Sequence, residues 1–535
     1  MFRYFGFHWN PAQTTEARSA QRFEELIERT AGWQRVLCRP GIRVYTIGHR
    51  PGVNGFHVLP NDQGVVLGRL FRRRNGVSEP EEIAFSSNES RQILRTEGRV
   101  LIDSYWGRYV AVLPSSLRGL CLVRDPSGAL PCFLSHVEGI AVFFSWLEDL
   151  FTFAPGAPVP RVSAGAIAVA TLIGHVGGSR TALEGISQVL PGQLTPIANN
   201  GQAPLTLWSV VDIAEQQVDW EHDMAARAVR RVVVDCVQAW ASCYAEILLR
   251  LSGGLDSAIL LGSLTARPNG AKLTCLNYFS AGSDSDERGF ARLAASSANV
   301  GLIEWERDAE FGLEEMVAAS RMPTPVNYLG RMDASRIDAD VAVAHGARVM
   351  FSGAGGDQVF FQHCCTWPAA DYLNVHGFGR GFVGAALDAA RLGKVSLWRS
   401  MRSALIARRH ADDDRWGIGQ FLKLVRREAF DSLGDADEYT HPDLKRAGRL
   451  PIGKYNHVRD LIDPPGYYDP YRAEEAPELL NPLLSQPLVE LCLALPTWLL
   501  SNGGRSRALE RQAFANDIPR EIAKRQSKGG MDEHS

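Results

Sequence analysis

The sequence lacks long apolar runs and a strong excess of charge of either sign. No apolar stretch reaches the roughly 20 residues that a membrane-spanning helix needs. The 535 residues carry a formal net charge of only −3, so there is no general basic field that would attract nucleic acid. We therefore expect neither a nucleic-acid partner nor stable insertion into a membrane.

Cysteine is scarce as well. The nine cysteines are an odd number and show no metal-ligand spacing. Such usage is typical of reduced thiols that pack as small apolar groups. Residues 1–7 are too short and too interrupted to form a signal peptide. We expect a cytoplasmic protein with reduced cysteines.

The length exceeds what one ordinary core can serve and indicates two or three domains. Residues 1–150 are mostly short segments with strand character around one helix near 86–96. A helical period follows at 220–240, with Met224, Ala228, Val232 and Cys236 on one stripe. From there apolar strands at 246–251, 273–279, 302–306 and 348–352 alternate with helices, and helices with loops follow from about 380. Alternation of this kind predicts a doubly wound parallel sheet.

The most informative residues lie between two apolar segments. Residues 251–257 read Leu-Ser-Gly-Gly-Leu-Asp-Ser, after a run at 245–251 that suits a buried strand and before one at 258–264 that suits a helix. A strand-to-helix turn directs backbone N–H groups and the positive end of a helix dipole at one place. Gly253 and Gly254 let an anion approach the backbone, because they have no Cβ atom.

Polar side chains in the same turn describe the anion further. Ser252 and Ser257 supply hydroxyl donors, whereas the carboxylate of Asp256 repels an anion unless a cation lies between them. This combination indicates a polyphosphate with Mg²⁺, a hard cation that binds oxygen ligands. An acid here also suits the N-terminal cap of a helix. The Walker loop is excluded, because no lysine follows the glycines.

A second glycine turn follows the strand near residue 350. Residues 351–360 read Phe-Ser-Gly-Ala-Gly-Gly-Asp-Gln-Val-Phe, which places Ser352 and Gly353 in the turn and supplies Asp357 as an acid. Ligands of open α/β sheets bind at the carboxyl ends of the strands. The second turn therefore repeats the pattern of the first, in which glycines and an acid follow a strand.

The two turns resemble the synthetase domain of the asparagine synthetase family, whose first turn is the Ser-Gly-Gly-x-Asp-Ser loop of N-type ATP pyrophosphatases. The second turn is similar to the family's Ser-Gly-x-Gly-Gly-Asp-Glu, with Gln358 in place of the glutamate. Residues 284–288, 478–484 and 525–528 also resemble family segments. The resemblance implies a ligase that splits ATP into AMP and pyrophosphate, with Mg²⁺ as its metal.

The N-terminal half resembles the glutaminase domain of the same family. Residues 124–131, Arg-Asp-Pro-Ser-Gly-Ala-Leu-Pro, are similar to its Arg-Asp-x-x-Gly-x-x-Pro, and residues 181–192 resemble its closing segment. The resemblance implies an α+β, Ntn-hydrolase-like sandwich domain at 1–205. An α/β, doubly wound ATP-pyrophosphatase domain with a helical C-terminal part is expected at 215–535.

Position 2 departs from the glutaminase pattern. Glutaminases of this class use a cysteine exposed by removal of Met1, whose thiolate is the nucleophile and whose free amine is the base. Here residue 2 is Phe, and the nearest cysteine is Cys38. We expect that this domain cannot release ammonia from glutamine, so that the substrate must carry its own amine.

Two branches of the family use an amine of the substrate. One closes β-lactam or carbapenam rings in small molecules, and the other joins the N-terminal amine of a lasso peptide to an Asp or Glu side chain. Residues 106–109, 483–492 and 527–530 resemble the lasso cyclases. We expect a lasso peptide cyclase that acts on a precursor core peptide, with a leader-binding protein and a leader peptidase as pathway partners. A small-molecule lactam synthetase, an ammonia-dependent asparagine synthetase and a non-catalytic scaffold are the alternatives.

The resemblance also implies roles for single residues. Lys528 is the candidate for stabilising negative charge during catalysis. Glu478 is the candidate base for the amine, and lactam-forming relatives pair such a glutamate with a tyrosine, for which Tyr467, Tyr468 and Tyr471 are near in sequence. The expected ATP site consists of Leu251, Ser252, Gly253, Gly254, Asp256, Ser257, Ser352 and Gly353, with Asp256 and Asp357 as ligands of Mg²⁺.

Overall fold

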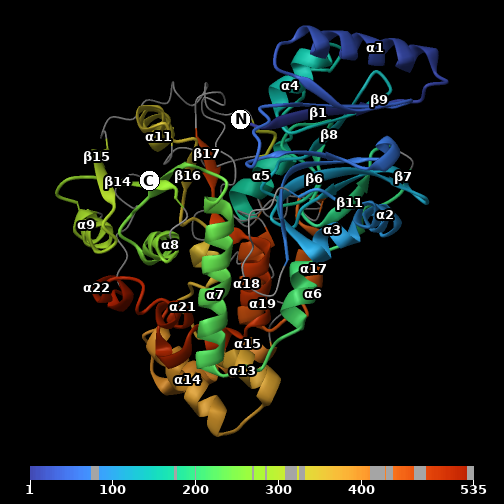
Figure 1. Cartoon of the computed structure of the whole chain (residues 1–535). Helices are drawn as coiled ribbons and strands as arrows, with labels where there is room; N and C mark the ends of the chain where they lie inside the picture. Colours follow the sequence, from blue (N-terminus) through green and yellow to red (C-terminus); the bar gives the residue numbers. More distant parts are fainter. Residues whose placement is uncertain are drawn as a thin grey trace.

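A computed structural model describes most of the chain. The described residues are 1–73, 83–173, 177–198, 201–267, 270–283, 286–307, 322–324, 332–409, 428, 438–462 and 477–526. They form two antiparallel sheets, one parallel sheet and a helical C-terminal part (Figure 1). Within these residues, no helix is both long enough and apolar enough to cross a bilayer.

The first antiparallel sheet is built around the strand at the start of the chain. β1 (Arg3–His8) pairs with β3 (Ile42–Ile47) on one side and with β9 (Ile140–Phe144) on the other. The complete order is β10 (Ile186–Gln188), β8 (Phe133–Val137), β9, β1, β3 and β2 (Gln34–Arg39).

The second antiparallel sheet is centred on β6 (Tyr105–Ser115), whose 11 residues pair with β5 (Val65–Arg72) and β7 (Gly119–Arg124). The complete order is β12 (Leu205–Thr206), β11 (Gln193–Pro196), β7, β6, β5 and β4 (Gly55–Val58), and a 3₁₀ turn η1 (Pro60–Asp62) precedes β5.

These two sheets pack face to face because their strands alternate between two buried sides. On β1, Tyr4 points into the core between the sheets, whereas Phe5 and Phe7 point outward under helices. The helices α1 (Thr14–Arg29) and α4 (Leu147–Phe153) cover the first sheet, and α2 (Ser87–Arg95) and α3 (Arg99–Ser104) cover the second. The structure thus has the expected sandwich, and its relation to glutaminases stays a prediction.

The third sheet is parallel throughout. Its order is β15 (Gly301–Glu306), β14 (Lys272–Phe279), β13 (Glu246–Arg250), β16 (Val349–Phe351) and β17 (Glu478–Leu480). Leu249 packs on the side of α7 (His222–Ala241) and α8 (Leu255–Thr265), whereas Leu248 packs on the side of α11 (Met332–His345). Helices on both faces confirm the predicted doubly wound α/β arrangement.

The order of this sheet determines where a site can form. β13 comes first in the chain, and the strands that follow it are added on both of its sides. The carboxyl ends of β13 and β16 therefore meet where the winding direction reverses, which is where open α/β sheets bind ligands. Both glycine turns of the sequence leave the sheet at this place.

The remaining helices lie beside the parallel sheet, below it and below the sandwich in Figure 1. They are α5 (Ala164–Ile173), α6 (Val210–Glu215), α9 (Arg288–Ser297), α12 (Gly356–Val359), α13 (Trp367–His376), α14 (Arg380–Leu392), α15 (Leu397–Arg409), α17 (Pro442–Ala447), α18 (Ile452–Ile462), η4 (Pro482–Leu484), α19 (Gln486–Ala494), α20 (Thr497–Leu500), η5 (Asn502–Gly504), α21 (Ala508–Ala513) and α22 (Arg520–Lys524).

The sandwich and the α/β part share a core. Phe71 of β5 stacks near Trp106 of β6 and meets Trp240 of α7 edge-on, with ring centroids 4.6 and 4.9 Å apart. Beside these rings, the Arg73 guanidinium donates to both oxygens of Glu490, at 2.7 and 2.8 Å. Apolar contact and a bidentate ion pair therefore hold the two halves together.

Candidate functional site

The first turn has the geometry of an anion site. Leu251 is buried at the end of β13, and Gly253 has φ +81°, in the left-handed region that favours glycine. α8 begins two residues later, so the N–H groups of its first turn, which have no partner inside the helix, face the end of the sheet. The Ser252 and Ser257 hydroxyls lie 3.1 Å apart beside them.

The second turn lies directly against the first. Ser352 follows the last residue of β16, and its N–H donates to the carbonyl of Leu480 at the end of β17. A Cβ atom on Gly353 would lie 3.0 Å from the Ser257 nitrogen, and one on Gly356 would lie 2.6 Å from the Asp256 carboxyl carbon. Glycine is needed at both positions because the two turns approach so closely.

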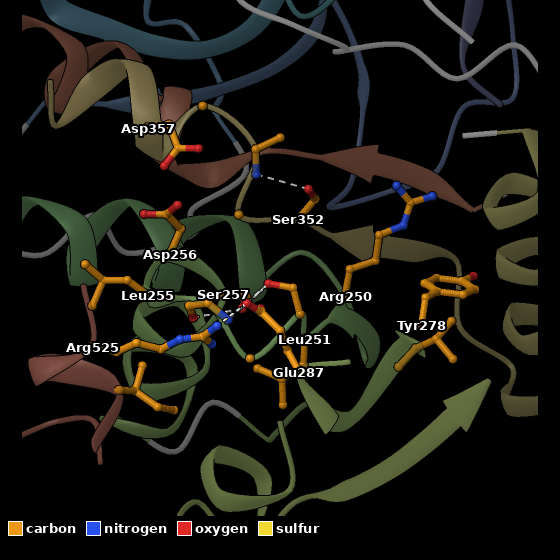
Figure 2. Close-up of a pocket in the computed structure, with 18 of the residues that line it drawn as sticks. Arg250, Leu251, Leu255, Asp256, Ser257, Tyr278, Glu287, Ser352, Asp357 and Arg525 are labelled. Carbon is orange, nitrogen blue, oxygen red and sulfur yellow. Dashed lines mark hydrogen bonds and ion pairs between the residues drawn. The ribbon is translucent and has the colours of Figure 1, made fainter. Parts of the chain in front are cut away.

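A pocket of about 290 Å³ opens between the two turns (Figure 2). All nine residues predicted for the ATP and metal sites line it. Its charged lining consists of Arg250, Arg307, Arg507, Arg511, Arg525, Asp256, Glu287 and Asp357. Five arginines against three acids give a positive surplus, which suits a polyanionic ligand.

The two predicted metal ligands come together. The Asp256 and Asp357 carboxylates lie close to each other in Figure 2, and one nitrogen of Arg507, Nη1, donates to both. Its distances are 2.8 and 2.9 Å to the oxygens of Asp256 and 2.8 Å to Oδ1 of Asp357. Since a single cationic atom can contact both acids, the pair fits a hard cation that takes carboxylate ligands.

A third acid lies behind this pair. Glu510 is fully buried, and its Oε2 is 3.8 Å from Nε of Arg507. Burial, and then the negative charge of Asp256, raise the pKa of Glu510 well above its usual range. Burial alone would lower the pKa of Arg507, but the surrounding carboxylates raise it, so the guanidinium stays charged.

The described C-terminal end closes the other side of the pocket. Arg525 donates to Glu287 at 2.5 Å and lies over the Phe290 ring at 4.1 Å. Both partners belong to the segment that starts α9, and a Cβ on Gly253 would lie 2.8 Å from the Glu287 carbonyl. The C-terminal segment thus joins the first glycine turn through α9.

Residues 228–535, more than half of the sequence, match the family model of asparagine synthase. The chain belongs to the asparagine synthase family. No curated protein matches it. Family membership supports an ATP-dependent, amide-forming ligase in general, and the family uses ATP, generally with Mg²⁺.

Glu478 of this asparagine synthase family member lies away from the pocket. It pairs with Val349 at the amino end of β16. On the neighbouring strand β13, Ile247 lies at the same level as Val349. Leu251, which lines the pocket, follows four residues later, about 13 Å along the strand. Its carboxylate accepts hydrogen bonds from Arg108 at 3.0 Å, Tyr244 at 2.9 Å and Asn54 at 3.3 Å.

The surroundings of Glu478 keep it ionised. Burial alone would raise its pKa, but the charge of Arg108 and the hydrogen bonds from Tyr244 and Arg108 outweigh burial and lower the pKa. A fully paired carboxylate at the wrong end of the sheet is poorly suited to accept a proton at the pocket. The geometry favours a structural role, in which Glu478 joins the parallel sheet to the sandwich.

Other predicted residues have different outcomes. Lys528, Asp284 and the tyrosines at 467, 468 and 471 lie outside the described residues. Among the residues that the structure describes, Tyr244 is a tyrosine that donates to Glu478. The helix-cap interpretation of Asp256 is wrong, because Gly254 is the N-cap of α8, without a side-chain cap bond, and Asp256 binds Arg507.

Sequence reasoning missed the basic residues of the pocket and one acid. Arg507, Glu510 and Arg511 belong to no recognised motif, and Arg507 is 251 positions from Asp256. A weak signal was present, since Arg-Ser-Arg at 505–507 precedes a short helix close to the matched 525–528 segment. Pairing across such a separation requires the fold.

Proposed function

We propose that this ligase is a lasso peptide cyclase. It adenylates an Asp or Glu side chain of a precursor core peptide and joins it to the peptide's N-terminal amine, releasing AMP and pyrophosphate. We also propose that it works in the cytoplasm with a leader-binding protein and a leader peptidase. The observation that carries the proposal is the burial of Phe2, which leaves the sandwich without the nucleophile of a glutaminase.

Phe2 is 5% exposed and packs in the core between the two antiparallel sheets. The sandwich holds three cysteines, and two of them, Cys121 and Cys132, are buried. Burial raises the pKa of Cys121 to about 12 and that of Cys132 to about 11, whereas Cys38 lies on the edge strand β2. Thiolates are the reactive form, so the amine is expected to come from the substrate.

The pocket residues account for activation of the carboxylate. Ser252, Ser257 and the amino end of α8 hold the phosphates, and Gly253 and Gly353 let them approach the backbone. Asp256 and Asp357 would hold Mg²⁺, and the ion would supply positive charge against the charge developing on the phosphates. Adenylation then makes the carboxyl oxygen a good leaving group.

The negative charge that develops after adenylation needs a basic residue nearby. We propose that Lys528 stabilises the tetrahedral oxyanion as the amine attacks, because an ammonium on a flexible stem can follow a moving centre. We assign Glu478 no part in this step, because its position and hydrogen bonds support a structural role. The Tyr244–Glu478 pair therefore does not favour a small-molecule lactam synthetase.

The test supplies purified protein with ATP, Mg²⁺ and a leader-free core peptide, and follows peptide mass and nucleotide products. Loss of one water from the peptide with formation of AMP and pyrophosphate supports the proposal. Asp256→Ala should abolish AMP formation, whereas the exposed Asp103→Ala, outside the pocket, should not. ADP formation, or an unchanged peptide, refutes it.

Parallel reactions separate the alternatives. Cyclisation of a small β-amino acid substrate, without action on the peptide, would identify a small-molecule lactam synthetase. Asparagine made from aspartate and ammonium would identify an ammonia-dependent synthetase. Nucleotide binding without AMP formation in every reaction would identify a scaffold.

A further inference from the structure

Arg507 lies where a metal ion would have to lie. Its Nη1 atom contacts carboxylate oxygens of both Asp256 and Asp357 within 2.9 Å, and its side chain is 7% exposed. A guanidinium held by two carboxylates from different loops is a strong, charge-assisted contact. A cation that binds the same two acids therefore competes with Arg507.

The charge of this cluster is not balanced by Arg507 alone. Glu510 lies behind the pair and is fully buried, and burial together with the negative charge of Asp256 raises its pKa well above its usual range, so it adds an uncharged acid to the cluster. Nε of Arg507 donates no hydrogen bond, although Glu510 lies 3.8 Å away. Arg507 thus shares its single positive charge between two carboxylates, and a divalent cation would neutralise both.

The backbone that carries Arg507 is unusual as well. Arg507 has φ +55° and ψ +42°, a left-handed conformation that residues other than glycine rarely adopt. Gly503 and Gly504, just before it, have φ +72° and +70°, and α21 begins immediately after it. Strained residues of this kind persist only when their surroundings hold them, and they are common at switching sites.

We propose that Arg507 is the resident counter-ion of the Asp256–Asp357 site, and that it leaves both carboxylates when a divalent cation binds there. The glycines at 503 and 504 permit the movement. The released guanidinium remains in the pocket lining, where phosphate oxygens can replace the carboxylates as its partners. Only the identity of this last partner rests on the proposed function.

The proposal predicts that the empty protein binds divalent cations weakly, because Arg507 holds the ligands. Binding of Mn²⁺ alone, without nucleotide, is measured by electron paramagnetic resonance for the full-length chain. Arg507→Ala should bind Mn²⁺ at least about tenfold more tightly than wild type, since breaking a close charge pair frees both acids. Arg507→Lys should lie between the two.

Controls identify the site. Arg505→Ala removes an exposed arginine from the same segment and should leave Mn²⁺ affinity unchanged. Asp256→Asn combined with Arg507→Ala should remove the gain. A folded Arg507→Ala protein with wild-type Mn²⁺ affinity overturns the proposal, even if AMP formation shows that the wild type is a ligase. A wild type that never forms AMP overturns the proposed function alone.

If Arg507→Ala does not fold, hydrogen exchange in the wild type replaces the variant. Adding saturating Mn²⁺ without nucleotide should speed amide exchange in residues 503–513, because release of Arg507 loosens the start of α21. Faster exchange there supports the proposal. Unchanged or slower exchange in that segment, with bound Mn²⁺, refutes it.

Discussion

Replacing Glu478 by glutamine separates a structural role from a catalytic one. The substitution keeps the size of the side chain but removes the charge that neutralises Arg108. The two side chains are only 11% and 8% exposed, so the arginine is left as a buried charge without an anionic partner. Breaking a buried ion pair from one side costs about 3–5 kcal/mol, which for cooperative unfolding of a chain of 535 residues corresponds to an unfolding temperature lower by roughly 3–5 °C.

Differential scanning fluorimetry measures the loss of stability, and peptide cyclisation well below the unfolding temperature measures the rate. We expect Glu478→Gln to cyclise at a rate within about threefold of wild type, whereas loss of a general base costs about 100-fold or more. Arg108→Gln in the same chain should restore most of the stability, because no buried charge remains unpaired. Wild-type stability with a cyclisation rate that falls about 100-fold would refute the structural interpretation.

Three further changes test other parts of the structure. Gly253→Ala places an alanine in a left-handed conformation and brings its Cβ atom within 2.8 Å of the Glu287 carbonyl. The rate of AMP formation should fall by about tenfold or more, while the free energy of unfolding falls by only about 1–2 kcal/mol. An unchanged rate of AMP formation contradicts this expectation. Burial lowers the pKa of Lys454 from 10.5 to about 7, so the unfolded chain binds more protons between these values and stability rises with pH there. Lys454→Met should remove that rise in urea unfolding at about pH 7 and about pH 10, and a persisting slope assigns it to other groups. Phe71→Ala deletes the ring that packs against Trp240, which should lower the free energy of unfolding by about 3–5 kcal/mol. The sandwich and the α/β part should then unfold in separate calorimetric transitions. A single transition at the wild-type temperature would show that the ring contributes little.

The parallel sheet and its pocket could be predicted because their signals are local. Apolar segments with turns at fixed offsets identify β13, β14, β15 and β16, and each observed strand agrees with its predicted range to within a few residues. The glycines at 253 and 353 are equally local signals, because a positive φ or a close approach admits almost no other residue. Because β13 and β16 are adjacent parallel strands, the turns that follow them lie at the same end of the sheet.

The helix at 222–241 shows where periodicity fails. The predicted stripe begins at Met224, which is 41% exposed, and the buried face instead passes through Ala225, Val229, Val233 and Val237. Alanine and valine lie on both sides of this helix, so the apolar period fits two neighbouring stripes equally well. Contact with the sheet decides between them, and that contact is not encoded in the helix alone.

Long-range pairing was beyond prediction for a different reason. Residues 3–39, which form β1, α1 and β2, carry no motif. Their two strands are stabilised by pairing with neighbouring strands of the first sheet. Glu478 was recognised by its motif, but its partners Arg108, Tyr244 and Asn54 lie 234 to 424 positions away. A motif identifies a residue's relatives, whereas its role depends on which distant side chains it meets.

The position of Arg507 late in the chain has a consequence for protein synthesis. Asp256 and Asp357 leave the ribosome well before their arginine, which follows 150 positions after the second acid. At about 5–20 residues per second, the two acids wait about 8–30 s for the guanidinium. Throughout that interval the two acids lack the guanidinium that contacts both of them in the folded chain. The order of the sequence thus makes the pocket the last part of the parallel sheet to be completed during translation.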